Sequence, residues 1–313
     1  AGIVFALTKD YLFLLLAALI GTINVTGTEV GPFLSIEQAM IPQTCAERRR
    51  TSAFALYSFV GTFATAAGAL LSGVPELLQG FGMGLEASFR PLFLAYALLG
   101  VATAGLFLLL SPATEMRGGE RGQPLGPGTK RIVTRLSLLF SLDSFAGGFV
   151  IQSLVAYWFF TRFGVPLRDL SLLFFWANIL TALSFFAAAK LAGRVGLVNT
   201  MVFTHLPSNV LLMLVPLAPS FPLAMALYLG RMAISQMDVP TRQSYIVAIV
   251  APEERTAAAG MTNIARNLAQ AVGPSVAGYA LTLSLAAPFL IGGGLKVIYD
   301  LALYFSFRGD KAA

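Results

Sequence analysis

The fold is decided by one unusual stretch that occurs twice in the chain. Residues 21–73 read GTINVTGTEVGPFLSIEQAMIPQTCAERRRTSAFALYSFVGTFATAAGALLSG, and residues 230–282 read GRMAISQMDVPTRQSYIVAIVAPEERTAAAGMTNIARNLAQAVGPSVAGYALT. Each copy is an apolar segment interrupted by an acid and a proline, then a Glu-Arg corner, then an apolar segment rich in small residues. The matching landmarks are Gly21 with Gly230, Glu29-Val30 with Asp238-Val239, Glu47-Arg48 with Glu254-Arg255, and Gly68 and Gly73 with Gly273 and Gly278. This pattern predicts a duplicated structural unit.

The composition indicates that this unit lies in a membrane. Hydrophobic residues make up 57% of the chain, charged residues 12%, and the mean hydropathy is +0.76, whereas soluble domains carry about 25% charged residues. Segments such as 91–111 and 170–189 carry no charge and reach the roughly 20 residues that a helix needs to cross a bilayer. Strict alternation of apolar and polar residues is absent from these segments, so the pattern favours a helical bundle over a barrel.

Applied along the chain, the same length criterion predicts nine complete spans after a short stub at residues 1–8. The predicted spans are 11–42, 51–75, 91–111, 133–161, 170–189, 197–217, 221–250, 256–283 and 286–307. The spans 11–42 and 221–250 are too long for a perpendicular crossing. Each contains a proline, Pro32 or Pro240, which removes a backbone hydrogen bond and therefore predicts a kinked or locally opened helix.

Basic residues predict the orientation, because Lys and Arg are retained on the cytoplasmic face. Thirteen basic residues, between Arg48 and Lys311, collect on one side of the predicted spans, and four collect on the other, namely Lys9, Arg90, Arg162 and Arg168. We therefore expect a multi-pass protein of the cytoplasmic membrane whose linker and C-terminus are cytoplasmic. The formal charge of +6 then reflects topology rather than binding to nucleic acid.

The repeat also predicts how the chain is divided. A polar segment rich in Gly and Pro, residues 113–130, reads as a flexible cytoplasmic linker between two helical halves, 1–112 and 131–313. The landmarks of the second half lie about 205 to 209 positions beyond those of the first. By this numbering two whole spans and most of a third precede residue 1 in a complete protein. Restoring them gives two halves of six spans each.

Taken together, repeat, topology and one loop motif resemble the major facilitator superfamily, from the end of its third helix to its twelfth. The segment AKLAGRVG from Ala189 is similar to the family's cytoplasmic loop signature Gly-x-Leu-Ala-Asp-Arg-x-Gly. Leu191, Ala192, Arg194 and Gly196 are in place, whereas alanine replaces the first glycine and Gly193 replaces the aspartate. The resemblance implies a gating role for Arg194 at this loop. GPSVAG at 273–278 resembles the Gly-Pro signature of drug antiporters, although that signature belongs in a different helix of the family.

The resemblance also implies that family helices one, four, seven and ten line a central cavity that opens alternately to each side. Ions in hydrocarbon cost about 2.5 to 3.5 kcal/mol each, so charges inside spans are expected to be paired or to face water. Apart from Arg135 at the cytoplasmic end of 133–161, nine charges lie within predicted spans: Glu29, Glu37, Asp143, Arg231, Asp238, Arg242, Arg266, Lys296 and Asp300. Six of them fall in the three predicted cavity helices that this chain contains.

The span 221–250 has the clearest polar stripe. Arg231, Ser235, Asp238, Arg242 and Tyr245 follow spacings of four, three, four and three, which place them on one helical face. This stripe indicates a path for substrate or protons. The alternative is that Asp238 only neutralises Arg242 one turn away and braces the kink.

Three acids in the other two cavity helices are further candidates. Asp143 is the only charge in its span beyond Arg135 at the cytoplasmic end, and a lone buried carboxyl can bind and release a proton near neutral pH. The alternative is a structural salt bridge with Arg242 or Arg266. Glu29 and Glu37 lie about 80° apart around an ideal helix, so both can edge the cavity, although Glu37 can instead pair with the basic residues 48–50.

Polar residues on the remaining spans receive less weight. Asn263, Arg266, Asn267 and Gln270 form a stripe for substrate binding or for hydrogen bonds between helices. His205, with Asn209 one turn on, is expected to be a hydrogen-bonded packing residue rather than a proton relay. Lys296 and Asp300 are expected to form a local ion pair.

At the cytoplasmic corners, Glu47, Arg48, Glu254 and Arg255 are candidates for gating salt bridges, against an ordinary solvated turn.

Catalysis is not indicated by the sequence. One histidine and one cysteine, far apart, form neither a metal cluster nor a nucleophile and base pair, and no phosphate-binding glycine loop is present. We therefore expect no enzyme activity, no metal and no cofactor. The prediction is a monomeric, proton-coupled secondary transporter that exports small amphiphiles or moves an organic anion. The alternative is a transporter-like sensor or scaffold without turnover.

Overall fold

Every regular element in the described part of the chain is helical. The computed structural model describes residues 1–20, 41, 45–109 and 124–309. The α-helices are α1 (Gly2–Leu7), α2 (Tyr11–Ile20), α4 (Arg50–Leu71), α5 (Val74–Gly80), α6 (Leu85–Leu108), α7 (Pro127–Gly147), α8 (Gln152–Phe163), α9 (Leu167–Val195), α10 (Leu197–Leu214), α11 (Phe221–Ser235), α12 (Asp238–Ile249), α13 (Arg255–Leu283) and α14 (Ala287–Phe307). The 3₁₀ turns are η2 (Glu47–Arg49), η4 (Gly148–Val150), η5 (Val215–Leu217) and η6 (Pro252–Glu254). The predicted all-α fold is confirmed.

Six helical segments in this part are long and apolar enough to cross a membrane. They are Arg50–Gly80, Leu85–Leu106, Pro127–Phe163, Leu167–Val195, Leu197–Leu217 and Ala287–Phe307, which correspond to six of the nine predicted spans. The chain is therefore an α-helical membrane protein. Of the other three predicted spans, 11–42 lies mostly outside the described residues and 221–250 is split into α11 and α12. The third, α13, has 29 residues, but its polar stripe lowers its hydropathy.

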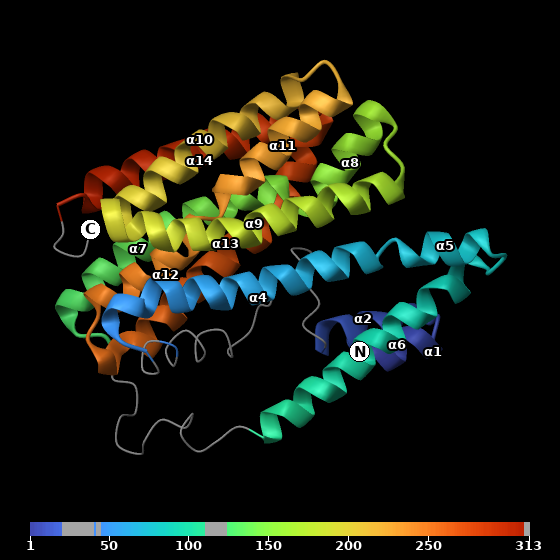
Figure 1. The fold of residues 1–313 in the computed structure, drawn as a ribbon, viewed down its shortest axis with the longest axis horizontal. Coiled ribbons are helices and arrows are strands. Elements are labelled where there is room, and N and C mark those ends of the chain that lie inside the picture. The colour runs from blue at the N-terminus through green and yellow to red at the C-terminus, as the bar shows by residue number, and fades with distance from the viewer. Residues whose placement is uncertain (21–40, 42–44, 110–123, 310–313) are drawn as a thin grey trace.

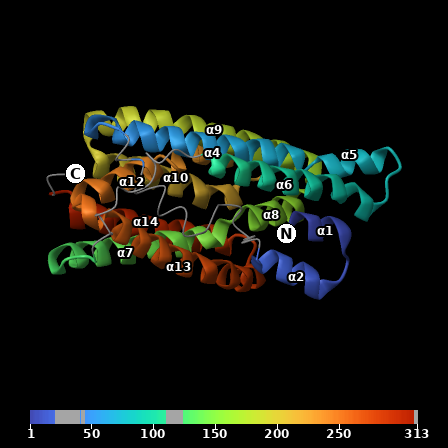
Figure 2. The same cartoon turned by 90° about the horizontal axis from the view of Figure 1, so that it is seen from below.

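The helices from α7 onward form one bundle, with α4 along its flank (Figures 1 and 2). Helix α4 lies beside α9 and α12, α7 lies beside α13 and α14, and α10 lies beside α11, α12 and α14. Helix α6 packs chiefly against α1 and α5 and extends away from the bundle (Figure 1). The bundle therefore consists mainly of the predicted second half, and the division at the linker stays a prediction.

The predicted opening of the helix near Pro240 is confirmed. Helix α11 ends at Ser235 and α12 begins at Asp238, with a turn at Gln236 and Met237 between them. Proline has no backbone N–H to give to the carbonyl four residues earlier, and its ring clashes with that carbonyl. The carbonyl in question belongs to Gln236, and it accepts instead from the Val239 backbone N–H at 3.1 Å. The corresponding proline of the first copy, Pro32, lies outside the described residues.

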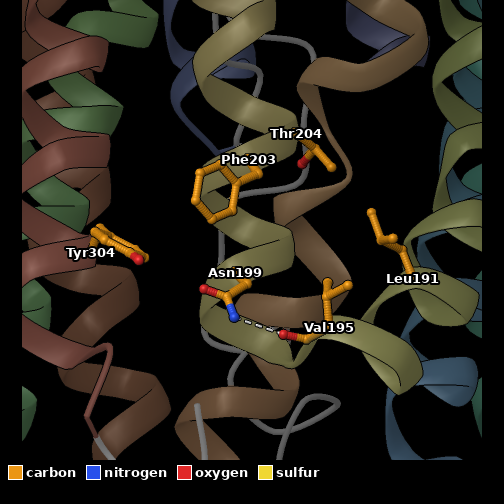
Figure 3. A pocket seen from close by; sticks show the side chains of 6 residues that line it. All are labelled: Leu191, Val195, Asn199, Phe203, Thr204 and Tyr304. Carbon is orange, nitrogen blue, oxygen red and sulfur yellow. Dashed lines mark hydrogen bonds between the residues drawn. The ribbon is translucent and has the colours of Figure 1, made fainter.

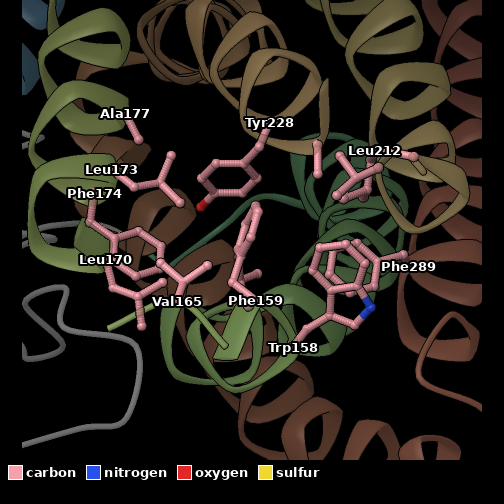
Figure 4. Close-up of a cluster of buried hydrophobic side chains, with 14 residues drawn as sticks. Trp158, Phe159, Val165, Leu170, Leu173, Phe174, Ala177, Leu212, Tyr228 and Phe289 are labelled. Atoms are coloured by element: carbon pink, nitrogen blue, oxygen red, sulfur yellow. The ribbon is translucent and has the colours of Figure 1, made fainter. Parts of the chain in front are cut away.

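Two apolar layers are stacked along the helix axes of the bundle. One layer joins α8, α9, α11 and α14, where Trp158 stacks near Phe289 and Phe159 lies edge-on to Tyr228 (Figure 4). The other layer joins α7, α10, α12 and α14 through buried side chains that include Leu136, Phe140, Met201, Tyr245, Tyr299 and Leu303. Inside a bilayer such layers are held by close packing rather than by transfer from water.

Two glycines bring α7 and α13 into backbone contact. A Cβ atom at Gly273 would lie 2.5 Å from the Phe145 carbonyl oxygen and 2.8 Å from the Gly148 Cα atom. Helix α7 ends at Gly147, and the next residue, Gly148, touches Gly273. Small residues serve this purpose in membrane bundles generally.

We expect Gly273→Ala to destabilise the protein by about 1 to 3 kcal/mol, because the added methyl group overlaps backbone atoms that cannot move aside. Thermal unfolding in detergent measures the effect. Gly278→Ala is the matched control, since it lies on the same helix and a Cβ atom there meets nothing within 4 Å. Equal unfolding temperatures for the two variants would contradict the contact.

Candidate functional site

Ionisable side chains from four helices gather inside the bundle. Six of the charges predicted to lie within spans are less than a tenth exposed, namely Asp143, Arg231, Asp238, Arg242, Lys296 and Asp300. The expectation that these ions avoid lipid is therefore met. Glu29 and Glu37, the corresponding acids of the first repeat, lie outside the described residues.

The closest ion pair of this network joins α7 to α14. The Lys296 ammonium lies 2.5 Å from the Asp143 Oδ1 atom. The second carboxylate oxygen of Asp143 lies 3.7 Å from the Arg242 guanidinium of α12. Asp143 is thus not a lone carboxyl, and the expected structural salt bridge is present. Its nearest cation is Lys296, rather than Arg242 or Arg266 as expected.

On α12, the Arg242 guanidinium donates to the Asp238 carboxylate one turn away, at 2.7 Å. Because Pro240 breaks the helix just before these residues, Asp238 takes the first position of α12 and its carboxylate faces Arg242. Arg242 also stacks over the Phe140 ring, 5.4 Å from its centroid. The local bracing expected from the sequence is present, and Arg242 additionally extends this pair toward Asp143.

The second centre of the network joins α10 to α14. The His205 Nδ1 atom lies 2.8 Å from Asp300 Oδ1, and the Asn209 amide donates to Asp300 Oδ2 at 2.8 Å. The other ring nitrogen of His205, Nε2, lies 3.9 Å from Asp143 Oδ1. His205 is buried and hydrogen-bonded, as expected, and its two ring nitrogens face the two carboxylates.

The predicted local ion pair between Lys296 and Asp300 is wrong. The Lys296 ammonium turns to α7, while the two Asp300 oxygens bond to His205 and Asn209 of α10. A four-residue spacing on one helix permits a pair of this kind, but in a packed bundle the neighbouring helices offer shorter contacts. Sequence reasoning therefore left four residues out of the site: His205, Asn209, Lys296 and Asp300. The sequence did contain a signal for these residues. Helix α10 and helix α14 each carry two polar residues one turn apart within an apolar span.

The polar stripe of α13 faces α7. The Arg266 Nε atom donates to the Ser144 hydroxyl at 3.0 Å, and Arg266 is partly buried. Asn263 is buried, whereas Asn267 and Gln270 are partly buried. The contact to Ser144 supports the reading of hydrogen bonds between helices.

Arg231 differs from the other buried cations. Its guanidinium contacts the Met232 sulfur at 3.1 Å, and its Nε atom has no hydrogen-bond partner. Among the described residues no carboxylate lies within 4.0 Å of it. Burial of such a cation is costly. In the described part of the bundle, three carboxylates (Asp143, Asp238, Asp300) face four cations (Arg231, Arg242, Arg266, Lys296), which leaves one positive charge in excess when His205 is neutral.

The charged network lies between the two apolar layers. Phe140, Met201, Tyr245 and Leu303 lie about one turn from Asp143, His205, Arg242 and Asp300, all toward the ends predicted to be cytoplasmic. In the opposite direction, Leu212 lies on α10, Phe289 lies on α14, and Tyr228 lies on α11, beyond the break that precedes α12. The network is therefore shielded along the helix axes in both directions.

The predicted gating residues lie at the helix ends. Glu254 accepts a hydrogen bond from the Gly126 backbone N–H at the start of α7, and Arg255 is partly buried at the start of α13. Arg48 and Arg194 are exposed. Glu47 begins η2, but its side chain lies outside the described part. A gating role for these residues stays a prediction.

A shallow surface pocket of about 420 Å³ lies elsewhere, between α9, α10 and α14 (Figure 3). Its lining is mostly apolar and consists of Leu191, Val195, Asn199, Phe203, Thr204 and Tyr304. None of the network charges lines it, so the charged network is the better candidate for the functional site. Among the described residues, His, Cys, Asp and Glu form no group of three or more that could hold a metal ion.

We expect strong energetic coupling between Asp143 and Lys296. Asp143→Asn leaves a buried ammonium without its partner, which costs about 3 to 5 kcal/mol, whereas adding Lys296→Met removes the stranded charge and recovers most of that loss. Thermal unfolding of the two single variants and the double variant measures the coupling.

The control cycle combines Lys296→Met with Asp300→Asn. Because Asp300 bonds to His205 and Asn209, we expect a smaller coupling in this second cycle. A larger coupling between Lys296 and Asp300 than between Lys296 and Asp143 would contradict the observed pairing.

The whole chain is similar to a yeast membrane protein. It is 28% identical over 348 residues to "Uncharacterized membrane protein YJR124C" of Saccharomyces cerevisiae (strain ATCC 204508 / S288c), an alignment that covers 100% of this chain and 78% of the relative. No family model matches the chain. The similarity agrees with the six membrane-spanning helical segments in identifying a membrane protein.

Proposed function

We propose that the protein is a secondary active transporter of the major facilitator type, which moves a small solute by alternating access and couples the movement to protons. The observation that carries the proposal is the charged network of Asp143, His205, Arg242, Lys296 and Asp300 at the centre of a membrane bundle. The doubled sequence unit and the loop similar to the family signature support the same assignment.

Stability alone does not account for such a network. Apolar residues of similar volume generally stabilise a buried site as well as an ion pair does, because two charges must be desolvated to form the pair. Ionisable residues within membrane spans accordingly mark solute and proton pathways. The network also links α7, α10, α12 and α14, so a change of charge on one carboxylate alters contacts between helices.

Proton coupling rests on the position of Asp143. Its carboxylate is the shared partner of Lys296 and Arg242. Protonation of Asp143 removes the negative charge that attracts both cations and so weakens the attachment of α7 to α14 and α12. In this proposal the proton favours one arrangement of the helices, and the apolar layers open on one side or the other as the arrangement changes.

Arg231 favours an organic anion over an amphiphilic cation as the solute. It is a buried cation that lacks a carboxylate partner within the described residues, and it supplies the excess positive charge of the site. An anionic group beside Arg231 would neutralise this excess. In the same proposal the linker and the C-terminus face the cytoplasm, as the distribution of Lys and Arg predicts.

Transport is tested with the full-length protein in liposomes. A panel of small organic anions and amphiphilic cations is offered with and without an imposed pH gradient, while solute uptake and luminal pH are recorded. We expect uptake of an anion that responds to the pH gradient, and loss of this response in Asp143→Asn. Asp169→Asn is the matched control, because Asp169 is exposed at the start of α9.

One result would favour the alternative function. A sensor or scaffold binds a member of the panel, for example by raising the unfolding temperature, without net movement of solute under any gradient. Binding without movement would therefore contradict the transporter proposal.

We expect Arg231→Gln to weaken anion uptake by about 10-fold or more, since a hydrogen bond to a charged group is worth about 1.5 to 3 kcal/mol. Arg231→Lys, which keeps the charge, is expected to retain part of the uptake. Arg168→Gln removes an exposed cation and serves as the control. Unchanged uptake in Arg231→Gln would exclude Arg231 from anion recognition.

A further inference from the structure

We infer that His205 is a proton relay between Asp300 and Asp143. This inference deepens the proposed function, because it assigns the path by which a proton reaches the carboxylate that holds α7 to α14. It rests on the placement of one imidazole between two carboxylates that belong to different helices.

The two ring nitrogens of His205 have different carboxylate neighbours at different distances. Nδ1 lies 2.8 Å from Asp300 Oδ1, which is hydrogen-bond distance, and Nε2 lies 3.9 Å from Asp143 Oδ1. The two nitrogens of one ring therefore face two different acids. An imidazole in this position can accept a proton at one nitrogen and release another proton from the opposite nitrogen.

The remaining groups around His205 define what it exchanges with. Its own helix supplies the Asn209 amide, 3.3 Å from Nδ1. Helix α14 supplies Asp300, Lys296 and the Tyr299 ring, which lies edge-on to the imidazole. Helices α7 and α12 supply Asp143 and, beyond it, Arg242. The carboxylates lie at opposite nitrogens, and the two cations Lys296 and Arg242 both contact Asp143.

The proposed proton transfer from Asp300 to Asp143 takes place in two steps. In the first, protonated Asp300 gives its proton to Nδ1 of a neutral His205 whose own proton is on Nε2, which leaves an Asp300 carboxylate and an imidazolium. In the second, the imidazolium gives its Nε2 proton to Asp143, which leaves neutral His205 with its proton on Nδ1 and a protonated Asp143. One proton has moved from α14 to α7, and no other reactant is required.

Lys296 controls the second step. It occupies Asp143 Oδ1, the same oxygen that His205 Nε2 approaches. At 3.9 Å from Asp143 Oδ1, the Nε2 atom is beyond hydrogen-bond distance. The structure therefore shows His205 bonded to Asp300 but not to Asp143. In this proposal, Nε2 comes within hydrogen-bond distance of Asp143 when α7 and α10 approach each other and Lys296 withdraws. Arrival of the proton on Asp143 then keeps Lys296 released, which couples the relay to the rearrangement of the helices.

His205 is the single histidine of these 313 residues, and its imidazole signals are identified as those that His205→Gln removes. The full-length protein, labelled with ¹⁵N-histidine and carrying a purification tag without histidine, is reconstituted in lipid. Solid-state NMR then reports the proton occupancy of Nδ1 and Nε2 separately as a function of pH. This experiment needs no solute, so it tests the relay independently of transport.

We expect a relay to show three properties. The imidazole populates both of its neutral tautomers across the pH range recorded. Asp300→Asn shifts the Nδ1 signal, and Asp143→Asn shifts the Nε2 signal. Thr204→Val is the control, because its hydroxyl bonds within α10 to the Thr200 carbonyl, and we expect no change in either signal.

A histidine that only packs the helices together gives a different result. It keeps one fixed tautomer across this pH range, and its Nε2 signal is insensitive to Asp143→Asn; either finding overturns the relay. Where Asp143→Asn does not fold, Asp143→Asn with Lys296→Met removes the stranded charge and provides the same comparison. Failure of the liposome assay, with all three NMR properties present, would overturn the transporter proposal and leave the proton path in place.

Discussion

An ionised side chain cannot face hydrocarbon, and this constraint determines how the bundle is assembled. A charge within a span is costly unless the protein supplies a partner or the charge faces water. Asp143 and Lys296 meet this requirement together and thereby fix α7 against α14. Arg242 and Asp238 bring α12 into the same network, and His205 with Asn209 bring in α10. The positions of four helices thus depend on one set of charges.

Packing and backbone geometry place these charges within reach of one another. The contact between Gly148 and Gly273 draws the end of α7 onto α13, where Arg266 reaches Ser144. The break before Pro240 sets Asp238 at the first position of a new helix. Apolar layers then cover the charges along the helix axes in both directions. An arrangement of this kind is stable while its charges are paired.

The sequence was most informative where local chemistry decides the structure. Apolar runs predicted six spans that the structure confirms, because the length of a membrane helix is fixed by the bilayer. Pro240 predicted the helix break, because the missing N–H and the ring clash act within four residues. The stripe on 221–250 predicted buried Arg231, Asp238 and Arg242 from helical periodicity alone.

Pairings between helices were harder to predict. Lys296 and Asp300 have the spacing of a local ion pair, yet their partners come from positions 153 and 95 residues away in the chain. The spacing says only which residues share a helical face, whereas the partner depends on which neighbouring helix brings the closest opposite charge. For the same reason Asp143 read as a lone carboxyl, and His205 read as a residue outside the site. Glu29 and Glu37 lie outside the described residues, so their place in the predicted cavity is untested.

The central claim is that Asp143 and Lys296 stabilise the fold as one buried pair, and exchanging their charges tests it most directly. The variants Asp143→Lys and Lys296→Asp each place two like charges together, and we expect neither to yield folded protein in the membrane. The double variant restores opposite charges at the same two positions, and the account predicts that it recovers folded, monodisperse protein by size-exclusion chromatography. A double variant that folds no better than the single variants would contradict the account.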